Sequence, residues 1–152
     1  MWQIIRDGDP RAYAMFQRHY SALPYRRRPR GNGTRFVGPG QYIALLSLDE
    51  RALLVWRKFR DKSGQTGVNC AIFRNENSAY RSSDLIRAAE QIAWQRWPNE
   101  RLYTYVNPRK IRSTNPGFCF LCAGWQKCGT TTKKLIILEK YPCGTPTTTN
   151  AS

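Results

Sequence analysis

The sequence is short of the groups on which most catalytic sites depend. It has a single histidine, His19, and only 10 acidic residues among 152. It contains no Gly-x-Ser-x-Gly nucleophile elbow, no Walker-type phosphate loop and no cluster of acidic metal ligands. These absences argue against serine hydrolases, nucleoside triphosphatases and two-metal nucleases.

Long apolar segments are missing as well. No run approaches the roughly 20 residues of a membrane span, and the first residues lack the apolar core of a signal peptide. The 5 cysteines are an odd number in a chain without a secretion signal, which favours free thiols in a reducing compartment. We therefore expect a cytoplasmic protein that does not enter the membrane.

Positive charge, in contrast, is abundant. The chain has 25 Lys and Arg against 10 Asp and Glu, a net charge of +15. Such a charge attracts polyanions and raises their local concentration. Nucleic acid is the first partner to consider. An anionic membrane surface, a phosphate-bearing cofactor and charge that serves only solubility are the alternatives.

The basic residues gather in two clusters. The first lies among proline and glycine next to Tyr25, whose ring could stack on a base. The second directly follows a predicted strand. The sequence therefore predicts nucleic-acid contacts at Tyr25, Arg26, Arg27, Arg28, Arg30, Arg109, Lys110 and Arg112. A basic loop that only projects into solvent is the alternative for the first cluster.

Apolar periodicity predicts one domain over residues 1–143 and a disordered tail over residues 144–152. Asp9 and Pro10 are typical of a helix start, and that helix should reach about Tyr20. A second helix should begin with a capped turn at Ser82-Ser83-Asp84 and end before Pro98. The predicted strands are Trp2–Ile5, Tyr42–Leu48, Ala52–Phe59, Val68–Phe73, Leu102–Val106 and Leu135–Glu139.

A short helix should precede Gly124-Trp125, and a polar hairpin should then lead into the strand Leu135–Glu139. The predicted order is then β, α, β, β, β, α, β, α, β. Helices interleaved with a mixed sheet indicate an α/β or α+β domain of three layers.

The cysteines allow two interpretations. Cys119, Cys122, Cys128 and Cys143 could together supply the four thiolates of a zinc site. Only the first two are close in sequence, however, and they lie in an apolar segment. Cys70 lies inside a predicted strand. We therefore expect structural thiols and no metal.

One junction has the features of an anion site. The apolar strand that ends near Phe73 is followed by a polar loop and a helix start at Ser82. Free backbone N–H groups at the positive end of a helix bind anions, and Arg74 and Arg81 flank this one. His19 is at a predicted helix end, where a histidine is more often structural than a general base.

The order of these elements, together with the turn, short helix and Gly124-Trp125 near the C-terminus, resembles the GNAT superfamily of N-acyltransferases. The resemblance implies a sheet that splays between Val68–Phe73 and Leu102–Val106. It also implies an acyl-CoA donor whose pyrophosphate lies at the start of the following helix. The segment from Asn77 to Ser83 lacks the glycines of the family's loop.

Within that superfamily the chain looks most like the phage Mom-type DNA-modification proteins. The elements that carry the likeness are His19-Tyr20-Ser21, the helix that ends at Pro98, and Phe120 to Trp125. The likeness implies a transferase that modifies a nucleobase, or an amine on a modified base, in DNA inside the host cytoplasm. It implies catalytic roles for His19 and Tyr20, and Asn107 occupies a position that is often acidic in the family.

The resemblance also assigns the donor contacts, which are Arg74, Arg81, Ser82, Ser83, Asn115 and Phe120. Two other functions stay open at this point. One is an acetyl-CoA-dependent N-acetyltransferase acting on a protein or a small amine. The other is a basic nucleic-acid-binding protein without catalysis.

Overall fold

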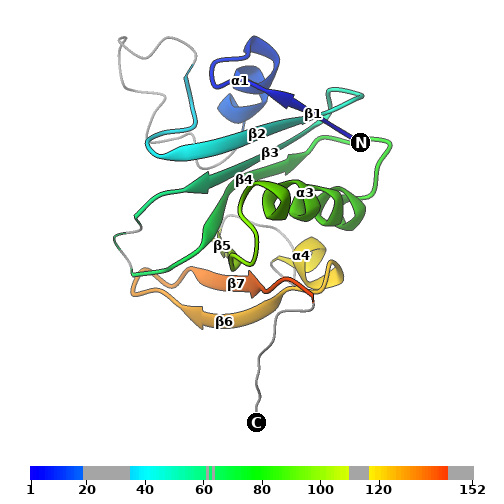
Figure 1. Ribbon diagram of the computed structural model, residues 1–152. Helices are drawn as coiled ribbons and strands as arrows, with labels where there is room; N and C mark the ends of the chain where they lie inside the picture. Colours follow the sequence, from blue (N-terminus) through cyan, green and yellow to red (C-terminus); the bar gives the residue numbers. More distant parts are fainter. Residues whose placement is uncertain (19–34, 61, 63, 110–116, 144–152) are drawn as a thin grey trace.

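The computed structural model describes residues 1–18, 35–60, 62, 64–109 and 117–143, and these form a mixed α+β fold (Figure 1). The elements are β1 (Trp2–Ile5), α1 (Pro10–Gln17), β2 (Gln41–Ser47), β3 (Ala52–Lys58), β4 (Val68–Asn75), α3 (Ser82–Arg96), β5 (Leu102–Val106), α4 (Phe118–Cys122), β6 (Gln126–Thr130) and β7 (Ile136–Lys140). The strands make one 7-stranded sheet in the order β1-β2-β3-β4-β5-β7-β6. Only β4 and β5 pair in parallel.

Helices cover both faces of this sheet because side chains alternate along each strand. On β2 and β3, Leu46 and Leu53 pack with α1. Their neighbours Leu45 and Leu54 face the opposite way and pack with α3 and α4. The mixed, helix-covered sheet expected from the sequence is confirmed at this level.

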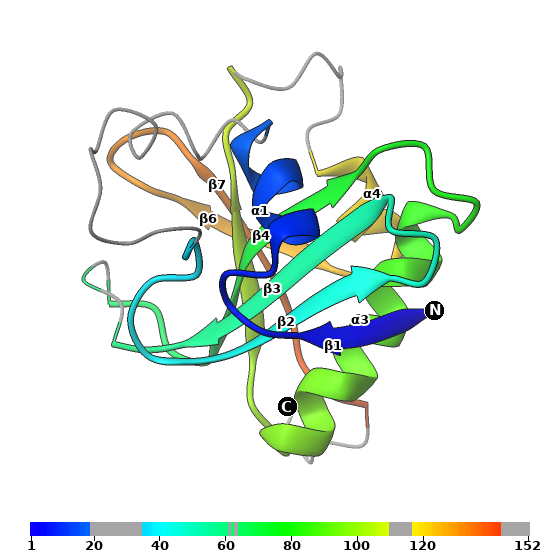
Figure 2. The ribbon, with the colours of Figure 1, turned by 90° about the horizontal axis from the view of Figure 1, so that it is seen from above.

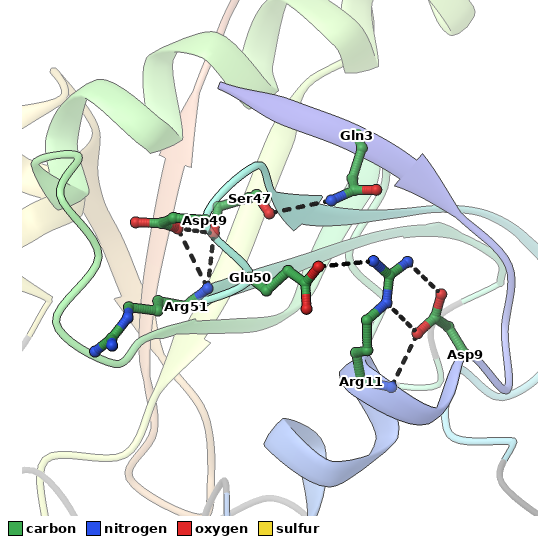
Figure 3. A network of polar contacts seen from close by, with 7 residues as sticks. All are labelled: Gln3, Asp9, Arg11, Ser47, Asp49, Glu50 and Arg51. Carbon is green, nitrogen blue, oxygen red and sulfur yellow. Dashed lines mark hydrogen bonds and ion pairs between the residues drawn. The ribbon is translucent and has the colours of Figure 1, made fainter.

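The start of α1 follows the sequence signal. Asp9 accepts a hydrogen bond from the backbone N–H of Arg11 at 2.9 Å, and Pro10 occupies the first turn. The Arg11 guanidinium also reaches Glu50 in the β2–β3 turn at 3.1 Å (Figure 3). The helix is thereby held to the end of the β2–β3 hairpin. It ends at Gln17, slightly earlier than predicted.

The start of α3 differs from the prediction. The N-cap residue is Arg81, and its side chain makes no capping hydrogen bond. The Ser82 hydroxyl, expected to cap the helix, instead accepts a hydrogen bond from the Asn75 amide at 2.9 Å. The serine holds the preceding loop to the end of β4, so the loop geometry decides the role of this residue.

The predicted order contains one strand too few. Gln126–Thr130 is strand β6, which lies in the predicted polar hairpin but has no place of its own in the predicted order. It is an edge strand, and nearly all of its side chains are exposed. Its sequence shows neither alternation of polar and apolar residues nor a high apolar content. The strand forms because its backbone pairs with β7, and its side chains are not buried by that pairing. Apart from the end of α1, the other boundaries agree with the predictions to within about two residues.

A buried carboxylate joins α3 to the C-terminal part of the sheet. Glu90 is 1% exposed, and it accepts hydrogen bonds from the Trp125 indole and from the Lys140 ammonium, both at 2.7 Å. The Lys140 ammonium also donates to the Ala123 carbonyl at 2.7 Å. Three elements therefore depend on one charge pair.

We expect Lys140→Met to lower the free energy of unfolding by about 3 kcal/mol, because the Glu90 carboxylate stays buried without its cation. Partial exposure of Lys140 keeps the cost at the lower end of the usual range. The double variant Glu90→Gln/Lys140→Met should recover much of this loss, since the amide still accepts from Trp125 and no charge is buried. Denaturant unfolding measures both, and equal losses in the single and double variants would contradict the assignment.

Candidate functional site: the fork between β4 and β5

The parallel contact between β4 and β5 is short. Only Val68 with Leu102 and Asn69 with Tyr103 are paired. Beyond them the Thr104 hydroxyl, instead of a backbone N–H, donates to the Cys70 carbonyl at 2.9 Å. The two strands then run apart towards their C-terminal ends (Figure 2). We call this divergence of Val68–Asn75 from Leu102–Val106 the fork.

The closed end of the fork is held by a close backbone approach. Gly67 has a φ of +114°, and a Cβ there would lie 2.2 Å from the Arg101 carbonyl oxygen. That same carbonyl accepts the hydrogen bond of the Val68 N–H at 2.8 Å. Glycine is therefore required where the strands meet.

A β-bulge bends β4 at the fork. Trp56 of β3 is opposite Cys70, and Val55 is opposite Ile72, so Ala71 is an extra residue on β4. Bulges bend the strand that carries them and are frequent beside active sites. The bend in β4 and the loss of pairing with β5 occur at the same point of the sheet.

Side chains shape the loop that follows β4. Asp49 accepts hydrogen bonds from the Ser78 hydroxyl and the Ala79 N–H, both at 2.9 Å. The hydrogen bond from the Ser47 hydroxyl is the main cause that lowers the pKa of Asp49 to about 2. Asn77 has a φ of +58°, the left-handed conformation for which glycine is usual. The loop thus turns tightly although it contains no glycine.

A carboxylate between two guanidinium groups fixes the end of α1 at the fork. Glu76 accepts from Arg18 at 2.6 and 2.7 Å and also forms an ion pair with Arg74. The hydrogen bonds from Arg18 are the main cause that lowers the pKa of Glu76 to about 2. Arg18 is the C-cap of α1, so this network holds the end of that helix beside the end of β4.

The predicted donor-binding residues at the start of α3 lie at the same end of β4. Arg81 is exposed and forms no ion pair with a described residue. Ser83 is buried, and Asp84 pairs with Arg87 at 3.2 Å. Since no side chain caps the first turn, its N–H groups and Arg81 fit a phosphate.

Phe120, also predicted to contact the donor, is buried in a row of aromatic rings. Its ring centroid is 5.8 Å from that of Phe73 and 4.9 Å from that of Trp125. Trp125 in turn stacks on Trp56 at 6.3 Å. The row connects the core beneath α3 to the end of β4 and makes one wall of the fork.

Asn107 directly follows β5, at the C-terminal end of the fork. Its amide oxygen accepts a hydrogen bond from the Arg109 N–H at 3.0 Å, which closes a turn at the strand end. The structure therefore gives Asn107 a turn-forming role and places Arg109 on the surface. Tyr105 on β5 is half-buried, with its ring 5.7 Å from that of Tyr103.

Several predicted residues cannot be placed. The described ranges do not include His19, Tyr20, Tyr25, Arg26, Arg27, Arg28, Arg30, Lys110, Arg112 and Asn115, nor the tail over residues 144–152.

The cysteines within the described residues are free thiols. Cys70 is buried, as expected, and burial raises the pKa of its thiol. In the described part of the chain no three His, Cys, Asp or Glu side chains come together as a metal site.

Sequence reasoning missed the two carboxylates that organise the fork, Asp49 and Glu76. Both are isolated polar residues in predicted turns, and their partners are distant along the chain. Nothing in the local sequence distinguishes them from solvated loop residues.

Comparison of the chain with known proteins finds no matching family model, curated protein or solved structure. Among the described residues, no helix is long and apolar enough to span a membrane.

We expect Glu76→Gln to lower the free energy of unfolding by about 1 kcal/mol at pH 7, because two charge-assisted contacts are weakened while Arg18 is half exposed to water. The difference from the unsubstituted protein should depend on pH. The folded state lowers the pKa of Glu76 from its ordinary value of 4.5 to about 2. Its stabilisation is therefore complete above about pH 5 and is lost as the pH falls towards 2.

Denaturant unfolding of both proteins across this pH range measures the effect. Glu50→Gln is the matched control, because Glu50 is half exposed and contacts only the exposed side chain of Arg11. A difference for Glu76→Gln that stays constant between pH 6 and pH 3 would contradict the assignment.

Proposed function

We propose that this protein is a GNAT-like, Mom-related transferase that modifies a nucleobase, or an amine on a modified base, in DNA. The observation that carries the proposal is the fork, since the resemblance to the superfamily implies a sheet that splays between these two parallel strands. Ligands of open α/β sheets bind beyond the carboxyl ends of such strands.

The position of α1 supports the catalytic assignment of His19 and Tyr20. Arg18, which immediately precedes them in the sequence, is held at the end of β4 by Glu76. We therefore assign the reaction to the C-terminal end of the fork. His19 would accept a proton from the amine that is modified or orient that amine, and Tyr20 would donate a proton or stack on the base.

The donor would be an acyl-CoA or another molecule of that type. Arg81, Ser82 and Ser83 at the first turn of α3, together with Arg74, would hold its phosphates. When bound, such a donor supplies an activated group for transfer to a nitrogen atom. Asn77 adopts the left-handed backbone conformation and would thereby replace a glycine of the superfamily's loop.

The shortage of acidic groups supports DNA as the substrate. Of the 10 acidic residues, all except Asp61 are among the described residues, and each of these accepts a hydrogen bond or an ion pair from within the chain. The positive excess is thus not neutralised by the protein itself, and a polyanion would neutralise it. A target base inside a duplex would have to be flipped out of the stack.

The test is mass spectrometry of nucleosides from plasmid DNA of cells that express the protein. We expect a nucleoside of altered mass with the unsubstituted chain, and a decrease of about 10²–10⁴-fold for His19→Ala, the usual contribution of a general base. Gln95→Ala, on the exposed side of α3, is the control and should leave the yield unchanged.

Other outcomes would support the other functions. Unmodified nucleosides together with acetylation of small amines or a protein by the purified chain would indicate an ordinary N-acetyltransferase. Unmodified nucleosides together with salt-dependent DNA binding that survives His19→Ala would indicate a binding protein without catalysis. Either result overturns the proposed activity.

A further inference from the structure

The C-terminal part of the sheet carries positive charge that no acidic residue balances. Residues 102–138 contain 6 Lys and Arg and no Asp or Glu. They make up β5, α4, β6 and most of β7. The next acidic residue, Glu139, already pairs with Arg101 at 2.5 Å. Among the described cations of this region, Arg109, Lys127, Lys133 and Lys134 take part in no ion pair.

Strand register places the end of β5 beside the start of β7. Val106, at the end of β5, is opposite Ile136, at the start of β7. The residues that follow β5 thus lie beside the turn that precedes β7, which contains Lys133 and Lys134. These two lysines and Arg109 are exposed and form no ion pair with a described residue.

This basic end is on the same side of the molecule as the C-terminal end of the fork. β5 ends there. In Figure 2, β4 and β5 diverge towards the top of the view, and the turn of the β6–β7 hairpin lies at the upper left. On the far side of the fork, Arg81 supplies a further unpaired cation at the start of α3. A polyanion that lies across the fork could contact both sides.

Strand β6 extends the surface along the edge of the sheet. Its side chains are polar or small, and Lys127 is exposed. Lys127 is opposite Leu138 and Gly129 is opposite Ile137, so Cys128 is an extra residue that makes a bulge. A bulge and a lysine on an edge strand disfavour pairing with another strand. The edge is therefore suited to a solvated polyanion and unsuited to a peptide.

We propose that the β6–β7 hairpin and the end of β5 bind the backbone phosphates of duplex DNA. Lys133, Lys134 and Arg109 are the principal contacts, and Lys127 continues them along β6. This inference rests on the proposed function in that DNA is the substrate, and it adds a part of the chain that the arginine-rich segments did not suggest. It holds the duplex so that the modified base lies at the fork.

The experiment compares duplex binding by the full-length protein and by Lys133→Gln/Lys134→Gln over a range of salt concentrations, with a labelled duplex of mixed sequence. Each lost phosphate contact lowers the slope of log affinity against log salt by about 0.9. We expect the slope of the double variant to be smaller by about 2.

Arg6→Gln/Arg60→Gln is the matched control, since it removes two exposed charges that follow β1 and β3, neither of which lies at the C-terminal end of β4 or in β6. Its slope should equal that of the unsubstituted protein. Equal slopes for the two double variants would overturn the inference. So would loss of binding to phosphatidylserine vesicles by the hairpin variant with unchanged binding to DNA.

The readout separates this inference from the proposed activity. A changed slope together with unmodified nucleosides would support the DNA-binding surface and contradict the proposed activity. Equal slopes together with modified nucleosides would contradict the surface and support the activity. Because Lys134 has a φ of +66°, Lys127→Gln/Lys133→Gln serves as a second variant that leaves this turn position intact and should show the same change of slope.

Discussion

The early end of the parallel pairing between β4 and β5 is the constraint on which the candidate site depends. Two residue pairs join the strands, and beyond them a threonine hydroxyl replaces the backbone ladder. A bulge in β4 bends that strand at the same point. The end of β4 then lies beside the start of α3, where Asn75 donates a hydrogen bond to Ser82.

Carboxylates hold the elements around this point. Glu76 fixes the end of α1 to the end of β4, and Asp49 fixes the loop that leads to α3. Glu90 does the same between α3 and β7 from inside the core. The described acidic residues all take part in internal contacts, whereas the side chains of Arg81, Arg109, Lys127, Lys133 and Lys134 are exposed. One distribution of charge therefore serves the stability of the fold and would serve the proposed contact with DNA.

Much of the fold could be predicted from the sequence. Asp9-Pro10 and Pro98 mark helix ends through local backbone chemistry, and the apolar segments of β2, β3 and β5 report burial directly. β6 could not be predicted, because its pairing partner and not its side chains defines it. The Ser82 cap was wrong because Asn75, seven residues away, competes for the hydroxyl. The structure places Arg74 and Arg81 at the end of β4 and the start of α3, and their role in binding a donor stays a prediction.

The sequence by itself determined the charge excess, the free thiols and the order of all but one element, since these follow from composition and local periodicity. Only the tertiary structure decided where the strands separate, which carboxylates hold the loops, and that the end of β5 lies beside the start of β7. Those features depend on contacts between residues far apart in the chain. Their energies come from strand register and paired charges that no local window of sequence contains.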